Sequence, residues 1–217
     1  GMILGGGGML GRLEPAPDSG ELRFVSLAGH FPGKLAGDFS VWSAVAIKDR
    51  IFFATDGAVI EWHGRGPAPF NWRGFAGQRP AVRLVGDEAF CHVGDELLRW
   101  REGNWQPFAR DPRLGAARRL TLLPAENGGV LAALDNGTLL RAAPDGALAP
   151  WPTPIDDFLR RTGIRNGLRL ADGSYLVSTA GEGLVQLAAD GVPVRRLTAA
   201  SGLAHAATYG LGLGRDG

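Results

Sequence analysis

The sequence is poor in cysteine, in lysine and in long hydrophobic runs, and each shortage excludes a class of protein. A single cysteine, Cys91, among 217 residues excludes a disulfide framework and a thiolate metal cluster. No apolar run reaches the roughly 18 residues that a transmembrane helix needs. Lysine is present only at Lys34 and Lys48, so almost all basic residues are arginine. The formal net charge of +1 argues against binding of nucleic acid or of an anionic membrane, because both need a concentrated positive field.

The N-terminal residues lack the features of a targeting signal. Gly1-Met2-Ile3-Leu4 has none of the basic residues that precede the apolar part of a signal peptide. A glycine before Met2 is typical of the remnant of a cleaved tag. We therefore expect the chain to be part of a longer protein.

Glycine is the residue in excess, with 34 of 217 positions, about twice the usual share. The glycines have no three-residue period, which excludes collagen, and 45% hydrophobic residues exclude a disordered chain. Many of them lie in Gly or Asp-Gly turns between two short apolar runs, as in Ile51–Thr55, Asp56-Gly57 and Ala58–Trp62. This pattern predicts β-hairpins.

Four such hairpins recur along the chain. Equivalent turn positions are Gly57, Asp95, Gly137 and Gly183, which lie 38, 42 and 46 residues apart. A further strand-like stretch precedes each hairpin and another follows it, so each repeat supplies four antiparallel strands. A period near 40 to 45 residues with four strands per repeat is typical of β-propeller blades. The predicted repeats are 41–73, 81–108, 118–151 and 165–198.

The two ends of the sequence together supply a fifth repeat. Residues 2–27 have the pattern of the last three strands of a blade, and residues 207–213, within the end segment 207–217, have the pattern of the missing inner strand. Pairing of these ends would close an all-β propeller of about five four-stranded blades within one domain, 1–217, and would remove exposed sheet edges. The same pattern also fits a piece cut from a larger ring, and the sequence leaves both readings open.

One segment departs from the strand pattern. Residues 154–162 begin with a proline, carry acidic residues in the first turn and basic residues in the last, and are followed by Gly163. These features predict a short helix between two blades, with Thr153 as its N-cap.

Patterns typical of catalysis and metal binding are missing from the sequence. The histidines are scattered without ligand spacing, and neither a nucleophile elbow nor a phosphate-binding loop is present. Asp-Gly pairs and adjacent acids are explained by turns and helix starts. We therefore predict a protein that is not an enzyme and that uses no metal and no cofactor.

The candidate binding residues stand at the entries of the innermost strands, because these positions rim the central channel of a propeller. They are Trp42, Arg79, Arg118, Arg165 and His205. Arginines beside a tryptophan suit an anionic or polar ligand, through bidentate hydrogen bonds and stacking. The alternative is that these arginines pair with neighbouring acids or face solvent. Trp62 and Trp100 share a place at the end of a third strand and are expected to pack in the core.

Several segments resemble the two-component-regulator propeller repeat. Leu170–Thr179, Gly183–Leu187 and Leu197–Ala204 have its Asp-Gly turn, its strands and its Ser-Gly-Leu loop. Ile3–Pro15 and Ile51–Gly57 are similar to the sensor regions of the same family. Family members usually have more blades than the five found here.

The resemblance implies a periplasmic sensor from a bacterial membrane receptor. Its ligand would be a small molecule or an oligosaccharide, and its partner would be the receptor's own output domain, a histidine kinase, a diguanylate cyclase or a DNA-binding domain, with nucleic acid not bound by the propeller itself. A homodimer is compatible with this interpretation. The main alternative is a five-bladed carbohydrate-binding, lectin-like module, and the third is a five-bladed glycosidase.

Overall fold

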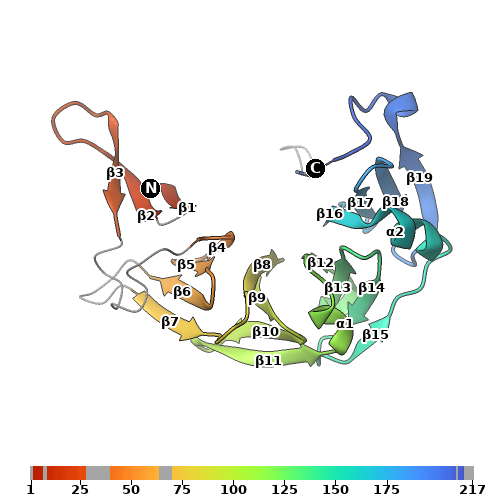
Figure 1. The fold of residues 1–217 in the computed structure, drawn as a ribbon, viewed down its shortest axis with the longest axis horizontal. Coiled ribbons are helices and arrows are strands. Elements are labelled where there is room, and N and C mark those ends of the chain that lie inside the picture. The colour runs from red at the N-terminus through yellow and green to blue at the C-terminus, as the bar shows by residue number, and fades with distance from the viewer. Residues whose placement is uncertain (1, 7–8, 28–39, 64–69, 209, 213–217) are drawn as a thin grey trace. The chain divides into compact units, whose positions relative to one another are not determined.

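The computed structural model describes residues 2–6, 9–27, 40–63, 70–208 and 210–212, and within these ranges the chain folds into five β-sheets (Figure 1). Two compact units make up the chain, the first from residues 1–94 with 98–106 and the second from residues 95–97 with 107–217. The sheets occupy the ranges in which the sequence predicts repeats. Each sheet places strands that are consecutive in the sequence side by side.

Three sheets belong mainly to the first unit. The first has the order β1-β2-β3 and the other two have the orders β4-β5-β6-β7 and β11-β10-β9-β8. Their bounds are β1 (Met2–Gly6), β2 (Met9–Pro15), β3 (Leu22–Ser26), β4 (Ser43–Ile47), β5 (Arg50–Ala54), β6 (Ala58–Trp62), β7 (Phe70–Gly74), β8 (Ala81–Val85), β9 (Glu88–Val93), β10 (Glu96–Arg101) and β11 (Asn104–Arg110).

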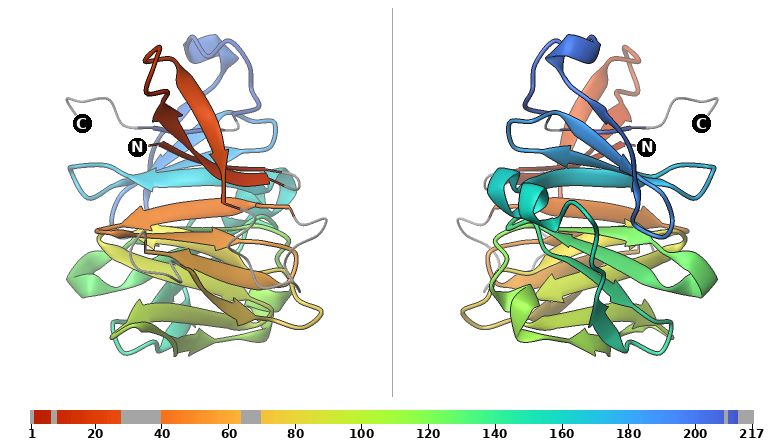
Figure 2. Two further views of the ribbon diagram at one scale, coloured as in Figure 1. Left: turned by 90° about the vertical axis from the view of Figure 1, so that its left-hand side faces the viewer. Right: turned by 90° about the vertical axis from the view of Figure 1, so that its right-hand side faces the viewer.

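The second unit holds the remaining two sheets, each with four strands in sequence order. Short helices connect or follow them (Figure 2). The bounds are α1 (Pro112–Gly115), β12 (Leu120–Pro124), the 3-10 helix η2 (Glu126–Gly128), β13 (Val130–Leu134), β14 (Leu139–Ala142), β15 (Leu148–Pro150), α2 (Asp156–Thr162), β16 (Ile164–Arg169), β17 (Tyr175–Thr179), β18 (Leu184–Leu187), β19 (Pro193–Leu197) and the 3-10 helix η3 (Ala199–Ser201).

The middle strands of the four-stranded sheets, such as β13 and β18, are buried on both faces, as expected for sheets that stack on sheets. In β5, Phe52 packs toward the sheet β8–β11, whereas its neighbour Phe53 packs with Leu10 and Ile60 toward the first sheet. Trp100 and Trp62 pack against these two clusters, which confirms the packing role predicted for them.

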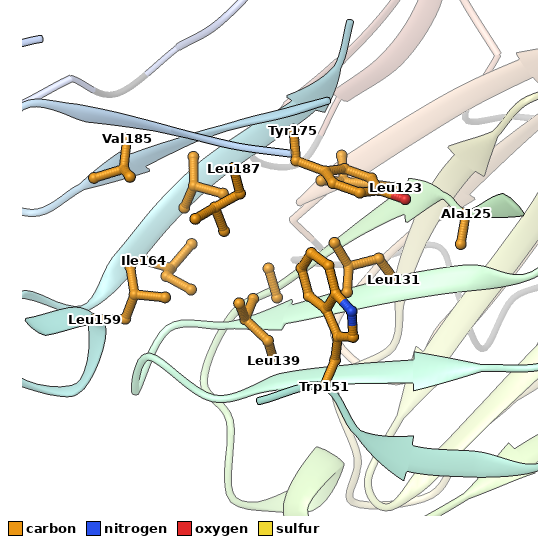
Figure 3. Packing of buried hydrophobic residues seen from close by; sticks show 12 residues of the cluster. Leu123, Ala125, Leu131, Leu139, Trp151, Leu159, Ile164, Tyr175, Val185 and Leu187 are labelled. Atoms are coloured by element: carbon orange, nitrogen blue, oxygen red, sulfur yellow. The ribbon is translucent and has the colours of Figure 1, made fainter. Parts of the chain in front are cut away.

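In the second unit, one apolar cluster joins the sheets β12–β15 and β16–β19 (Figure 3). Trp151 and Tyr175 meet edge to face with ring centroids 5.5 Å apart. Leu159 of α2 is fully buried in the same cluster, which also contains Leu139 of one sheet and Ile164 of the next. Burial of Leu159 therefore fixes α2 beside both sheets.

The helix start predicted at Thr153 is wrong by two residues. The helix begins at Asp156, and the Thr153 hydroxyl donates to the Asp156 carboxylate at 2.7 Å instead of accepting a helix N–H. The Thr153 N–H donates to the same carboxylate oxygen at 2.9 Å. The predicted C-terminal glycine is confirmed, because Gly163 has a φ of 66° and its N–H bonds to Leu159.

The predicted closing strand at 207–213 is not formed in the residues that can be described. Residues 207–208 and 210–212 are not in a strand, while Tyr209 and residues 213–217 lie outside the described part of the chain. The first sheet has three strands, as predicted for residues 2–27. Pairing of the two ends, and with it a single closed domain, stays a prediction.

Candidate anion-binding site

Arg118 and Arg165, two of the predicted binding residues, line one cavity in the second unit. The cavity has a volume of about 390 Å³ and lies between the sheets β12–β15 and β16–β19. Its charged lining residues are Arg118, Arg119, Arg160, Arg161, Arg165 and Asp135. Because five arginines and a single aspartate line it, we call this site the arginine cavity.

The first wall is the segment that leads from α1 into β12, and Asp135 fixes it. The backbone N–H of Arg118 donates to Asp135 Oδ1 at 3.2 Å, and the backbone N–H of Asp135 donates to the Arg119 carbonyl oxygen at 3.1 Å. Both arginine residues are exposed. Within the described ranges, neither guanidinium lies in an ion pair with a carboxylate. Both charges are therefore available to a ligand.

The second wall contains Arg165, which sits in a β-bulge. In the ladder between β16 and β17, Ile164 pairs with Thr179 and Asn166 pairs with Ser178, so Arg165 has no residue opposite it. A bulge bends the strand and redirects the side chain of the extra residue, and bulges are frequent beside binding sites. The irregularity thus gives Arg165 a placement that a regular strand would not.

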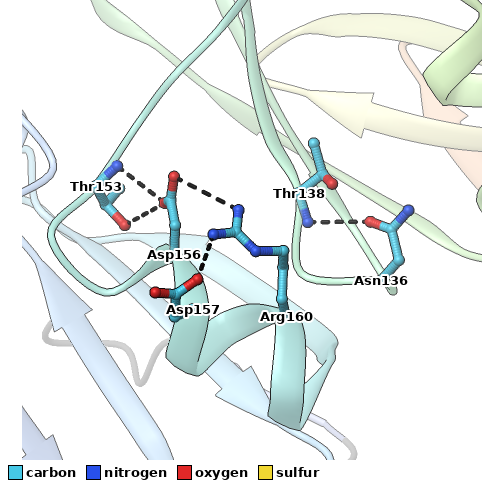
Figure 4. A network of polar contacts seen from close by, with 6 residues as sticks. All are labelled: Asn136, Thr138, Thr153, Asp156, Asp157 and Arg160. Carbon is cyan, nitrogen blue, oxygen red and sulfur yellow. Dashed lines mark hydrogen bonds and ion pairs between the residues drawn. The ribbon is translucent and has the colours of Figure 1, made fainter.

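The last turn of α2 adds two more arginines to the second wall. Arg160 donates to Asp157 at 2.6 Å and lies 4.0 Å from Asp156 (Figure 4). Its hydrogen bond, supported by its charge and by that of Arg161, holds the pKa of Asp157 below the usual value. Arg160 is thus bound within its own helix, whereas Arg161 contributes a nearby charge without a carboxylate inside 4 Å in the described residues.

One backbone hydrogen bond joins the two walls, and a second braces the second wall. The Ile164 N–H donates to the Asp135 carbonyl at 3.2 Å, across the two sheets. The Ala180 N–H donates to Thr162, at 3.3 Å, and so ties the end of β17 to α2. A Cβ at Gly163 would lie 2.8 Å from the Asp135 carbonyl oxygen, so only glycine fits this position. The arginine cavity is therefore built on rigid, mutually bonded elements.

Trp42 and Arg79, two further predicted residues, come together in the first unit. The Arg79 guanidinium carbon lies 3.2 Å from the centroid of the Trp42 ring, a cation–π contact. Trp42 immediately precedes β4, where its N–H bonds to Ala54, and its side chain is 45% exposed. The Arg79 guanidinium therefore already lies on one face of the Trp42 ring.

His205 lies apart from the arginine cavity in the second unit. It follows η3 in an irregular segment, is exposed, and is not among the residues that line the cavity. The expected inner strand at 207–213, which was to place it at a strand entry, is not found in the described residues.

Two cavities of the first unit have balanced or internally paired charges. One, of about 140 Å³, contains Glu61, which is bonded to Arg50 and to Asn71, and Arg73, which donates to the Trp105 carbonyl at 2.7 Å. The other, of about 310 Å³, mixes basic residues with acids, and its Arg101 is paired with Glu88. Of the three cavities, the arginine cavity alone carries a strong excess of one charge.

Sequence reasoning missed Arg119, Arg160 and Arg161. The helix dipole explains why the residues at the end of the predicted helix are basic. It does not show which residues of other elements lie beside them. Arg119 could have been found from the doublet Arg118-Arg119, since both residues precede the same strand. No group of metal-ligating side chains occurs among the residues that the structure describes. Within the same ranges, no helix has the length and apolar character of a membrane span.

Comparisons with known proteins identify the fold but not a family. No protein-family model matches the chain, and no curated protein sequence does. The structure of YCF48 bound to D1 peptide superposes with a TM-score of 0.59 at 14% identity, covering 90% of this chain and 64% of that one. BamB from Moraxella catarrhalis gives a TM-score of 0.53 at 13% identity, covering 90% of this chain and 59% of that one.

A third similar structure is the extracellular domain of BT4673 from B. thetaiotaomicron, described as a hybrid two-component system. Its TM-score is 0.49 at 14% identity, and the match covers 86% of this chain and 28% of that one. This chain thus spans less than two thirds of each of these three relatives. At such identities the likeness concerns the fold alone, and the chain has the all-β fold of a propeller, built from antiparallel sheets of three or four strands.

Proposed function

We propose that this chain is a non-enzymatic, ligand-binding propeller, and that its ligand is an anion held in the arginine cavity. The observation that carries the proposal is the unbalanced lining, in which five arginines accompany one aspartate. Arginine presents a planar fork of donors that matches carboxylate and phosphate oxygens. A volume of about 390 Å³ lies within the range of small-molecule sites.

In the wider proposal, the propeller is the extracytoplasmic sensor portion of a bacterial signalling receptor. The resemblance of Leu170–Thr179 and Leu197–Ala204 to the two-component-regulator repeat supports this role. YCF48 was solved with a bound peptide, so a propeller with a similar chain fold can take a ligand. The receptor's output domain, the periplasmic location and the ligand's identity all belong to this proposal.

Isothermal titration calorimetry with small anions tests the binding function. The probes are acetate, inorganic phosphate and adipate, with neutral glucose as the test of the carbohydrate-binding alternative. A hydrogen bond to a charged group contributes about 1.5–3 kcal/mol, so Arg118→Ala with Arg165→Ala should weaken anion binding at least tenfold.

The matched control removes two arginines from another exposed surface. Arg12 and Arg23 lie beside Glu14 in the first sheet, and their replacement by alanine changes the net charge equally. This control should bind anions like the parent chain. Equal weakening in both double variants, or binding of glucose but of no anion, would overturn the proposal.

A further inference from the structure

The larger of the two cavities in the first unit is lined by three turns and one tryptophan. Its volume of about 310 Å³ lies within the range of small-molecule sites. Lys48 comes from the turn between β4 and β5, Asp87 from the turn between β8 and β9, and Glu102 from the turn between β10 and β11. Trp100, near the end of β10, supplies an aromatic surface, so we call this site the Trp100 cavity.

Two neighbouring rings hold Trp100 in a fixed orientation. The centroid of its ring lies 4.8 Å from that of Phe52 and 5.2 Å from that of Trp105, and the ring planes are inclined by 58° and 68°. Phe52 and Trp105 are buried in the cluster between the two four-stranded sheets, whereas Trp100 is only partly buried. The cavity therefore has an apolar surface that is already ordered before a ligand binds.

The charged groups around Trp100 are of both signs, which favours a neutral ligand. Arg101 is paired with Glu88 at 3.0 Å, and Arg50 is paired with Glu61. The Arg50 guanidinium carbon lies 5.9 Å from the centroid of the Trp100 ring, so its charge disfavours a cation there. The four carboxylates of the lining disfavour an anion. Hydroxyl groups suit such a site, because a hydroxyl can donate to a carboxylate and accept from an ammonium or guanidinium group.

Two residues of the lining have a backbone conformation that favours glycine. Lys48 has a φ of 53° and Glu102 a φ of 52°, in the left-handed region that residues with a Cβ rarely adopt. The equivalent turn of the next sheet has Gly86, with a φ of 58°, in the place of Lys48. Among the residues that the structure describes, neither Lys48 nor Glu102 lies in an ion pair. Strained backbone of this kind is frequent at binding sites, and a ligand would explain why both side chains are present.

We infer that the Trp100 cavity binds a neutral saccharide, with one sugar ring packed on the indole of Trp100 and its hydroxyl groups hydrogen-bonded to Lys48, Asp87 and Glu102. The Trp100 cavity shares no lining residue with the arginine cavity. The inference is therefore independent of the proposed anion binding, and binding of glucose together with an anion agrees with both.

Calorimetry with neutral sugars tests the inference on the whole chain. The probes are glucose, galactose, maltose and cellobiose, with choline as the cationic comparison. We expect at least one sugar to bind, and its affinity to fall about tenfold or more in Trp100→Ala. Trp62→Ala is the matched control, because Trp62 ends the equivalent strand β6 and does not line the cavity. It should bind the sugar like the parent chain, and circular dichroism confirms that both variants are folded.

Glycine substitutions separate binding from stability. Lys48→Gly and Glu102→Gly relieve the left-handed backbone, so each variant should unfold at the same temperature as the parent chain or at a higher one. Its sugar affinity should nevertheless fall severalfold. Asn127→Gly is the control, because Asn127 has a φ of 53° and lies outside the cavity lining. It should leave sugar binding unchanged.

The inference is overturned if none of the four sugars binds, or if Trp100→Ala and both glycine variants bind a sugar like the parent chain. Equal weakening by Trp100→Ala and Trp62→Ala would also overturn it. Choline binding that Trp100→Ala abolishes, in the absence of sugar binding, would assign the cavity to a cation instead. Anion binding without sugar binding would remove this inference alone, whereas sugar binding without anion binding would remove only the proposed function.

Discussion

The backbone N–H of Ile164 donates to the carbonyl oxygen of Asp135 at 3.2 Å, and this bond joins the two sheets that form the arginine cavity. The side-chain carboxylate of the same aspartate accepts a hydrogen bond from the backbone N–H of Arg118. One residue thus positions both walls. The backbone segments that carry Arg118 and Arg165 are therefore joined through Asp135.

Two substitutions at Asp135 should separate its structural role from its charge. Asp135→Ala removes the acceptor of the Arg118 N–H and should lower the free energy of unfolding by about 1 kcal/mol. Asp135→Asn keeps an oxygen acceptor and removes the negative charge, so it should tighten anion binding severalfold with little loss of stability. Chemical denaturation and calorimetry measure the two effects, and weaker anion binding by Asp135→Asn would contradict the assigned geometry.

Gly163→Ala should disturb both stability and binding. The residue has a φ of 66°, and its new Cβ would lie 2.8 Å from the Asp135 carbonyl that accepts the Ile164 N–H. We expect a loss of about 1–3 kcal/mol in unfolding free energy, together with weaker anion binding. Gly20→Ala is the control, because it has a φ of 71° but open space around the added methyl group. It should cost about 1 kcal/mol and leave binding unchanged; equal effects on binding would argue against the role of Gly163.

Binding of a carboxylate such as adipate in the arginine cavity should not change with pH between about pH 6 and pH 9, because arginine stays charged throughout. A carboxylate ligand should bind less well only near its own pKa, at the acidic end. His205→Ala should bind like the parent chain, since His205 is outside the cavity lining. A loss of affinity with a midpoint near the pKa of histidine would favour a site that includes His205.

Cys91 should be unreactive in the native protein. Burial raises the pKa of its thiol to about 12, so almost no thiolate is present near neutral pH. Labelling with a disulfide reagent should be slow in buffer and fast in denaturant, with one thiol per chain. Rapid labelling under native conditions would show that the core formed by Phe52, Val82 and Leu98 opens readily.

Much of the fold could be predicted because its signals are local. Turn residues such as Gly137 and Gly183, both with positive φ, mark the hairpins independently of their surroundings. The start of α2 was misplaced because Thr153 and Asp156 bond to each other, an outcome that the capping pattern alone does not distinguish. The short helix α1 was missed, although Asp111 followed by Pro112 is a helix-start signal and Asp111 does accept the Arg113 N–H.

The candidate site could be predicted only in part, since it depends on contacts between elements. Arg118 and Arg165 were found because both precede or begin an inner strand. Arg161 could not be placed beside them, because its position follows from burial of Leu159 between two sheets. The bulge at Arg165 has no evident sequence signal either.

The most direct measurement is a titration with adipate followed by nuclear magnetic resonance of the arginine Nε–Hε groups. Binding in the arginine cavity should shift the signals of Arg118, Arg119, Arg161 and Arg165, while those of Arg12 and Arg23 stay unchanged. Shifts centred on Arg79, which stacks on Trp42, or spread evenly over all arginines, would contradict binding in this cavity.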